Sequence, residues 1–323
     1  MSDKEIPMLN SEFKEAWEKA SCFGNSKCFE ERAKLLADIS RENAFALLFE
    51  RELTAKEIQN NGLFCSVTEK VNSTKKPGRF VRPSDFEKIQ LDGGGIEDLH
   101  TVENINPGLI GITVDYLTRL MTGDIAEKAF HISLMGADKV NAGAEAEALL
   151  KMVNGLDDNS ICAAVRLAGF DSIYRAGESA YVPIEQIYPD NRTIENIINM
   201  VERSIEFFDS YGPKIADHLT FKGGYTGHVT NGDGDFLTKD TLWDKDTLWD
   251  FKVSKQRLSS KSVLQLLIYW RLGLHSIHPE YQRIKYLGVY NPRMNVIYRY
   301  SVDKISEKAI EELDYSIICY PRK

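Results

Sequence analysis

The order of strand and helix patterns after Pro213 is the feature that most restricts how this chain can fold. Short runs bounded by glycine, asparagine and proline predict strands, and a longer apolar run behind a serine predicts a capped helix. The predicted elements are, in chain order, strands at 221–230, after Asp235 and at 247–254, a helix from Ser259 or Ser260 to about Leu272, strands at 284–290 and 295–302, and a helix at 304–313. This order predicts an α/β unit built on a mixed sheet.

Most of the chain before Pro213 has helical periodicity instead. The predicted helices cover 11–20, 29–58, 108–121, 125–136, 142–153 and 192–208, and a stretch rich in Lys, Pro, Gly and Ser at 72–95 predicts a loop or linker. We therefore expect a helical N-terminal region with a linker at 1–106. An α/β domain follows at 107–323, with a helical insertion at about 122–212.

A tandem duplication interrupts the α/β unit. Asp240–Lys245, with the sequence DTLWDK, is followed at once by Asp246–Phe251, with the sequence DTLWDF. Such a unit is too short to be a structural repeat. The duplication predicts a longer hairpin, or a bulge, between two strands.

The charge of the chain is unevenly distributed. The whole chain carries a net charge of −8, but residues 251–300 hold nine basic residues and one acidic residue, a local charge of +8. Phosphate binding requires a local basic patch, whatever the total charge; a solvated basic face is the alternative. The patch predicts contacts to nucleic acid through Lys255, Arg257, Lys261 and Arg271.

No segment predicts a membrane span or an oxidising compartment. No apolar run approaches the roughly 20 residues that cross a bilayer, and the first residues lack the apolar stretch of a secretion signal. The five cysteines are widely scattered, which argues against a disulfide framework. We expect a cytoplasmic protein.

Three residues of the predicted sheet have the chemistry of a magnesium site. Asp250 and Lys252 are two apart on a strand and share a face, while Trp249 and Phe251 point into the core. Asp235, at the start of a neighbouring strand, would add a second carboxylate. Two carboxylates suit Mg²⁺ or Mn²⁺, which lowers the pKa of a bound water, and Lys252 could orient that water or stabilise developing charge. An isolated Asp-x-Lys is more often a salt pair at a strand edge.

Further residues extend this pattern in a fixed order. Gly-x-Asp ends at Asp235, Asp-x-Lys covers 250–252, and Gln265-x-x-x-Tyr269 follows on the predicted helix. This order resembles the RecB-like branch of the PD-(D/E)XK nuclease superfamily, over about 108–302. The resemblance implies a restriction-endonuclease-like core and metal-dependent hydrolysis of phosphodiester bonds.

The resemblance also implies roles for residues outside the trio. Gln265 and Tyr269, one helical turn apart, would contact substrate or brace the site. In this branch an earlier helix carries Gly-x-x-(His, Glu or Asp) and adds a metal ligand; Gly111 and Asp115 are similar, with one residue more between them. Rival carboxylates are Asp233 for the position of Asp235, Glu202 and Glu206 for that of Asp115, and Asp244 from the duplication.

The leading expectation is a deoxyribonuclease that uses Mg²⁺ or Mn²⁺. RNA stays open as a substrate, as does exonuclease against endonuclease activity. A catalytically inactive nucleic-acid-binding or protein-interaction module on the same fold is the alternative. The N-terminal helical region would shape a substrate channel or bind a protein partner, and a homo-oligomer stays open.

Overall fold

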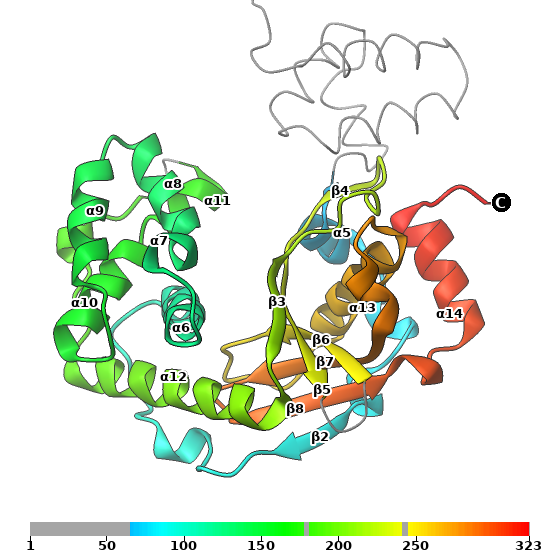
Figure 1. Cartoon of the computed structure of the whole chain (residues 1–323), viewed down its shortest axis with the longest axis horizontal. Helices are drawn as coiled ribbons and strands as arrows, with labels where there is room; N and C mark the ends of the chain where they lie inside the picture. Colours follow the sequence, from blue (N-terminus) through cyan, green and yellow to red (C-terminus); the bar gives the residue numbers. More distant parts are fainter. Residues whose placement is uncertain (1–64, 178–180, 241–244, 323) are drawn as a thin grey trace, which may run out of the picture.

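The computed structural model describes residues 65–177, 181–240 and 245–322. The helices expected at 11–20 and 29–58 lie outside the described residues, as does Asp244 of the duplication. Within the described part, one group of helices lies beside a sheet that carries its own helices (Figure 1).

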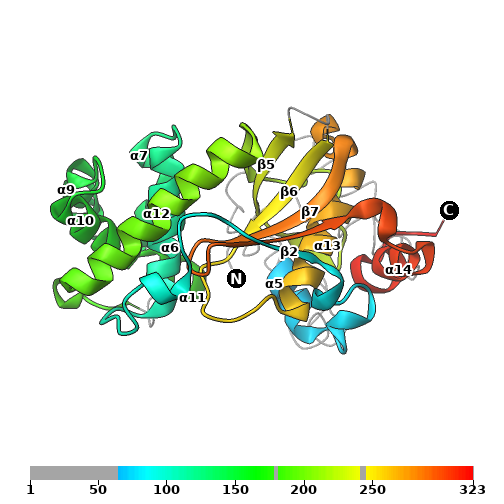
Figure 2. The same cartoon turned by 90° about the horizontal axis from the view of Figure 1, so that it is seen from below.

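A six-stranded mixed sheet forms the centre of the α/β part. Its strands, in spatial order, are β2 (Glu87–Gln90), β8 (Val296–Ser301), β7 (Ile284–Asn291), β6 (Lys245–Phe251), β5 (Gly234–Asp240) and β3 (Lys214–Leu219). β6 and β7 pair in parallel, and the other neighbours pair antiparallel. Parallel strands need a crossover connection, and α13 (Ser260–His275) supplies it (Figure 2). The predicted α/β class with a mixed sheet is confirmed.

The strand expected at 221–230 is wrong in its position. β3 ends at Leu219, and a turn follows in which Gly224 N donates to the Phe221 carbonyl at 2.8 Å. Gly223 has a φ of +85°, and a Cβ at Gly224 would lie 2.0 Å from the Leu272 carbonyl. The Gly-Gly pair therefore forms a turn pressed against α13, and only β4 (Val229–Asn231) remains extended, paired in parallel with β1 (Cys65–Ser66).

The segment expected as loop at 72–95 contributes the edge strand β2, which pairs with β8. Before it, α5 (Val67–Ser73) begins at a capping box: Ser66 Oγ accepts from Glu69 N at 3.1 Å, and the Glu69 carboxylate accepts from Ser66 N at 2.8 Å. Short 3₁₀ turns connect the remainder, namely η1 (Pro77–Arg79), η2 (Pro83–Asp85) and η3 (Ile96–Asp98).

The helical part confirms most of the expected helices, with shifted ends. It comprises α6 (Pro107–Met121), α7 (Ala126–Ala129), α8 (His131–Lys139), α9 (Gly143–Met152), α10 (Asp158–Ala168), α11 (Asp171–Ala176), η5 (Ile184–Gln186) and α12 (Asn191–Tyr211). The single helix expected at 125–136 is divided at Phe130 into α7 and α8. α10 was not predicted from the sequence; Asp157 caps it by accepting from Asn159 N and Ser160 N.

Apolar side chains cover the two faces of the sheet with different helices. Phe207 of α12 packs edge-on against Trp249 and stacks on Tyr290, with ring centroids 4.9 and 4.2 Å apart. On the other face, Leu248 and Leu287 lie in a second core with the buried side of α13. The sheet is therefore buried on both faces, and a polar side chain within it needs a specific partner.

Short helical elements precede β7 and follow β8. These are η6 (Pro279–Arg283) before β7, η7 (Val302–Lys304) after β8, α14 (Glu307–Glu312) and a terminal π-helical turn, η8 (Leu313–Ile318). Across the described residues, no helix has both the length and the apolar character that crossing a bilayer requires.

Two helical glycines test how tightly the helical part is packed. A Cβ at Gly136 of α8 would lie 2.0 Å from the Phe170 carbonyl, whereas one at Gly111 of α6 would lie 3.6 Å from Val253 Cβ, an ordinary contact. Both changes to alanine gain helix propensity. We expect Gly136→Ala to lower the free energy of unfolding by about 1–3 kcal/mol, since overpacking must move the backbone.

Gly111→Ala is the matched control, and it should raise that free energy by up to about 1 kcal/mol. Urea denaturation of both variants measures the difference. Equal effects of the two substitutions would contradict the close packing of α8 on Phe170.

Candidate functional site

Asp235 and Asp250 face each other across the β5–β6 hairpin. Phe236 pairs with Trp249 in the antiparallel register, so the next pair along the strands is Asp235 with Asp250. Phe236 and Trp249 lie in the core under α12. Because side chains alternate along a strand, both carboxylates project to the α13 side.

Asp250 is a buried carboxylate with one oxygen satisfied. Its side chain is 2% exposed, and Oδ1 accepts from Lys252 Nζ at 2.8 Å. Oδ2 is buried and has no hydrogen-bond partner among the described residues. Lys252 stays on the same side because its backbone N–H donates to the Tyr290 carbonyl at 2.9 Å and so prolongs the pairing with β7. A buried carboxylate oxygen without a donor is costly unless a cation approaches it.

Asp235 is held by the backbone of the neighbouring strand. Its Oδ2 accepts from Phe251 N at 2.5 Å, and its side chain is 23% exposed. Burial, followed by the charge of Asp250, raises the pKa of Asp235 to about 7. Burial also raises the pKa of Asp250, although Lys252 opposes this. Asp235 therefore keeps its proton for part of the time at neutral pH.

Lys252 remains a cation at this site. Burial would lower its pKa, but the carboxylates of Asp250 and Asp235 outweigh burial and raise it. Its side chain is 37% exposed, so the ammonium group keeps access to solvent while it contacts Asp250. A charged, partly exposed ammonium beside two carboxylates can hold a water molecule or a phosphate oxygen.

Asp115 of α6 also belongs to this site, but its ion-pair partner is Arg119, whereas Asp250 pairs with Lys252. Arg119, one helical turn later, donates through Nε to Asp115 Oδ1 at 3.0 Å, and its Nη2 lies 3.7 Å from Asp235 Oδ1. Its side chain is 11% exposed. Arg119 thus links the α6 carboxylate to the strand carboxylate. Arg119 was not among the predicted site residues, although its i, i+4 spacing from Asp115 indicates an ion pair on one helix face.

Asp115, Asp235 and Asp250 do not form a compact three-ligand group. Among the described residues, only Asp124, Asp217 and His218 bring three ligand atoms within 4.8 Å of one another. Two lysines already neutralise that group: Lys128 Nζ lies 2.9 Å from Asp124 and 3.0 Å from Asp217, and Lys214 Nζ lies 2.8 Å from Asp217. A divalent cation there would have to displace these lysines, whereas Asp250 Oδ2 has no hydrogen-bond partner in the described ranges.

Gln265 and Tyr269 of α13 lie over the carboxylates as one unit. Gln265 Nε2 donates to the Tyr269 hydroxyl at 2.8 Å, and the Tyr269 ring stacks on Phe221 with centroids 5.3 Å apart. Burial, followed by the charges of Asp250 and Asp233, raises the pKa of Tyr269 well above its usual value. Tyr269 is therefore a neutral phenol that faces the acidic side of the site.

The rival carboxylates are placed differently. Asp233 is exposed and precedes β5. Glu202 and Glu206 are exposed on α12, which covers the opposite face of the sheet, and Glu206 lies near the turn at Gly93. These positions favour Asp235 as the first strand carboxylate, and they separate both glutamates from it.

The basic segment is partly neutralised by acids from outside it. Arg271 forms an ion pair with Asp314 at 2.7 Å and is 12% exposed, so its guanidinium is not available to a phosphate in this structure. Arg283 pairs with Asp246 at 2.9 Å, and the largely buried Arg293 pairs with Glu103 at 2.7 Å. The local charge of +8 therefore overstates the basic surface.

The other three expected nucleic-acid contacts remain exposed. Lys255 Nζ donates to the Thr101 carbonyl at 3.1 Å and lies 3.6 Å from Glu103. Lys261 Nζ donates to Asn72 Oδ1 at 2.8 Å. Arg257 is exposed in the connection between β6 and α13. Lys255 and Arg257 lie in the connection that leads from Lys252 to α13, and Lys261 lies in the first turn of α13.

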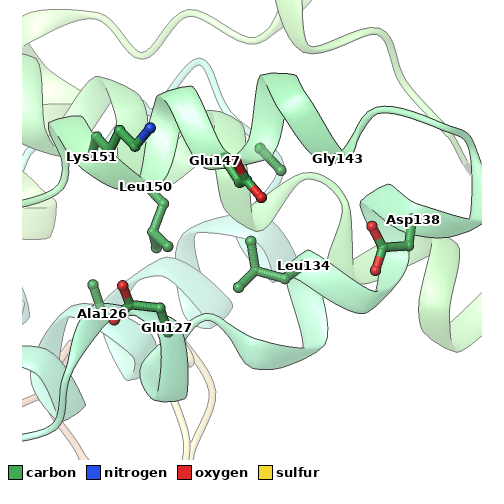
Figure 3. A pocket seen from close by; sticks show the side chains of 9 residues that line it. Ala126, Glu127, Leu134, Asp138, Gly143, Glu147, Leu150 and Lys151 are labelled. Carbon is green, nitrogen blue, oxygen red and sulfur yellow. The ribbon is translucent and has the colours of Figure 1, made fainter.

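A separate pocket of about 430 Å³ lies among α7, α8 and α9 (Figure 3). Leu134 and Leu150 line it, together with the carboxylates of Glu127, Asp138 and Glu147 and the ammonium group of Lys151. These four charged side chains sum to a charge of −2 when ionised, which disfavours the binding of a phosphate.

Comparisons of this chain with protein-family models, with curated proteins and with solved structures found no match.

The pH dependence of stability tests the carboxylate pairing. Because the pKa of Asp235 is raised in the folded chain from 3.8 to about 7, the folded state holds a proton there that the unfolded state has released. Stability must then fall as the pH rises from about 4 to about 7. We expect Asp235→Asn to gain stability relative to wild type over this range, by on the order of 1–3 kcal/mol at neutral pH.

Urea denaturation in EDTA at several pH values measures this difference. Asp303→Asn, at an exposed position, is the control and should show no such trend. A difference between wild type and Asp235→Asn that does not change with pH would show that Asp235 titrates normally.

Proposed function

We propose that this chain is a metal-dependent nuclease of the PD-(D/E)XK type, in its RecB-like branch, with DNA as its substrate and a restriction-endonuclease-like core. The observation that carries the proposal is the buried Oδ2 of Asp250, which has no hydrogen-bond partner among the residues described and lies opposite Asp235 and next to Lys252. The order β3, β5, β6, α13, β7 supports it, since three strands, a crossover helix and a parallel strand place these residues together.

The donor set fits Mg²⁺ or Mn²⁺. Asp235 and Asp250 would hold the ion, because hard cations prefer carboxylate oxygens and retain several waters. When bound, the ion supplies an acidified water and neutralises charge on the phosphate.

Each remaining residue has a role that its position supports. Lys252, partly exposed and 2.8 Å from Asp250, would orient the attacking water and stabilise the charge that develops on the phosphate. Tyr269 offers a neutral hydroxyl, and Gln265 fixes its direction. Arg257, Lys255 and Lys261 would contact the nucleic-acid backbone, where positive charge supplies affinity without reading sequence.

A catalytically inactive nucleic-acid-binding module is the second candidate. The ion pair of Asp115 with Arg119 favours it, because the pair leaves two carboxylates rather than three for a metal. Calorimetric titration with Mn²⁺ separates the two candidates, since the inactive module would give no binding heat.

Cleavage of plasmid and oligonucleotide DNA with Mg²⁺ or Mn²⁺ tests the proposed activity. Asp250→Asn and Lys252→Met should each lower the cleavage rate by at least about 100-fold, since each removes a group that holds the ion or stabilises the transition state. Thermal denaturation shows whether the variants fold. An RNA oligonucleotide of the same sequence tests the alternative substrate.

Two substitutions serve as matched controls. Asp233→Asn removes the rival carboxylate next to Asp235, and Asp303→Asn removes an exposed aspartate elsewhere; both should keep wild-type rates. Full activity in Asp250→Asn would end the catalytic proposal. Loss of activity in Asp233→Asn together with full activity in Asp235→Asn would move the first carboxylate to Asp233.

The surface cations make a separate prediction. Arg257→Gln should weaken binding of a DNA oligonucleotide and reduce the slope of log K against log salt by about 1, because one phosphate contact is lost. Fluorescence anisotropy in Ca²⁺ over a range of salt concentrations measures both quantities. Arg271→Gln is the control: it should lower stability, because Asp314 loses its partner, and leave the salt slope unchanged. The reverse pattern would place the binding surface near Arg271.

A further inference from the structure

The side chain of Arg119 lies between two carboxylates of the site. Its guanidinium contacts Asp115 through Nε at 3.0 Å and approaches Asp235 through Nη2 at 3.7 Å. The side chain is 11% exposed, and Nη1 is buried with no hydrogen-bond partner in the described part of the chain. The cation is thus enclosed within the site and does not reach over it from solvent.

We infer that Arg119 replaces a second metal ion, so that this site binds a single divalent cation at Asp235 and Asp250 while Asp115 serves as the anchor of Arg119. The inference rests on the proposed function and specifies its metal stoichiometry. It also changes the expected role of Asp115 from metal ligand to positioning residue.

Asp115 and Asp250 differ in their hydrogen bonds. Asp115 already accepts a charge-assisted hydrogen bond from Arg119. Asp250 Oδ2 is buried and has no hydrogen-bond partner within the part of the chain that the structure describes. A divalent cation gains most where a carboxylate oxygen is unsatisfied, which is at Asp250, opposite Asp235.

The formal charges agree with one ion. Asp115, Asp235 and Asp250 together with Arg119 and Lys252 carry a net charge of −1 when all five are ionised. One divalent cation and one phosphodiester bring the group to neutrality, whereas two cations would leave it at +2. Uncompensated charge in a partly dehydrated site is costly. A guanidinium cannot release its proton, so this fixed charge opposes a second ion at any pH.

Calorimetric titration of the full chain with Mn²⁺ tests the inference without depending on activity. We expect wild type to bind one ion, and Asp250→Asn to lose the binding heat. Asp115→Asn should still bind one ion, with an affinity lowered by at most about tenfold. This is the lower end of the roughly 10–100-fold loss that follows when a residue that supports a metal ligand is removed. Arg119→Met should bind more than one ion, since Asp115 and Asp235 lose their cation, and Arg119→Lys should restore a stoichiometry of one.

Two ions in wild type would overturn the inference, and so would one ion in Arg119→Met. A loss of binding in Asp115→Asn as complete as in Asp250→Asn would make Asp115 a ligand and have the same consequence. Circular dichroism reports whether each variant folds; if Arg119→Met does not, the Asp115→Asn result decides. An absence of binding heat in wild type would instead refute the proposed metal-dependent function itself.

Discussion

Asp235 and Asp250 face each other across one hairpin, and the repulsion between their carboxylates is the constraint around which the site is organised. The antiparallel register of β5 with β6 sets them opposite each other, and burial prevents water from screening them fully. Lys252 and Arg119 offset part of the repulsion. One oxygen of Asp250 has no hydrogen-bond partner among residues 65–177, 181–240 and 245–322, and the proposed metal ion would bind there.

The apolar packing of β6 against α12 determines the side of the sheet to which Asp250 projects. Trp249 lies under Phe207 and Tyr211 of α12, so it fixes which face of β6 is turned toward the helical part. Asp250, one residue later, must then project to the side of α13. A shift of one residue in register would turn Asp250 toward the apolar core under α12 and Trp249 toward α13. The aromatic packing against α12 therefore sets the direction of the Asp250 carboxylate on the other face of the sheet.

The sequence predicted the parts of this arrangement that depend on local pattern. Strand periodicity placed Asp250 and Lys252 on one face, and the order of elements predicted the mixed sheet with its helix. The strand predicted at 221–230 was misplaced, because the turn at Gly223 and Gly224 depends on close contact with the Leu272 carbonyl. Neither the role of Arg119 nor the ion pair of Arg271 with Asp314 was predicted, since each depends on which element packs beside it.

A crystal grown with Mn²⁺ and measured at a wavelength where manganese scatters anomalously tests the central claim most directly. The account predicts an anomalous peak between the carboxylates of Asp235 and Asp250, at the roughly 2.0–2.6 Å that divalent cations keep from carboxylate oxygens. Peaks confined to Asp124, Asp217 and His218, or carboxylates of Asp235 and Asp250 that turn away from each other, would contradict it.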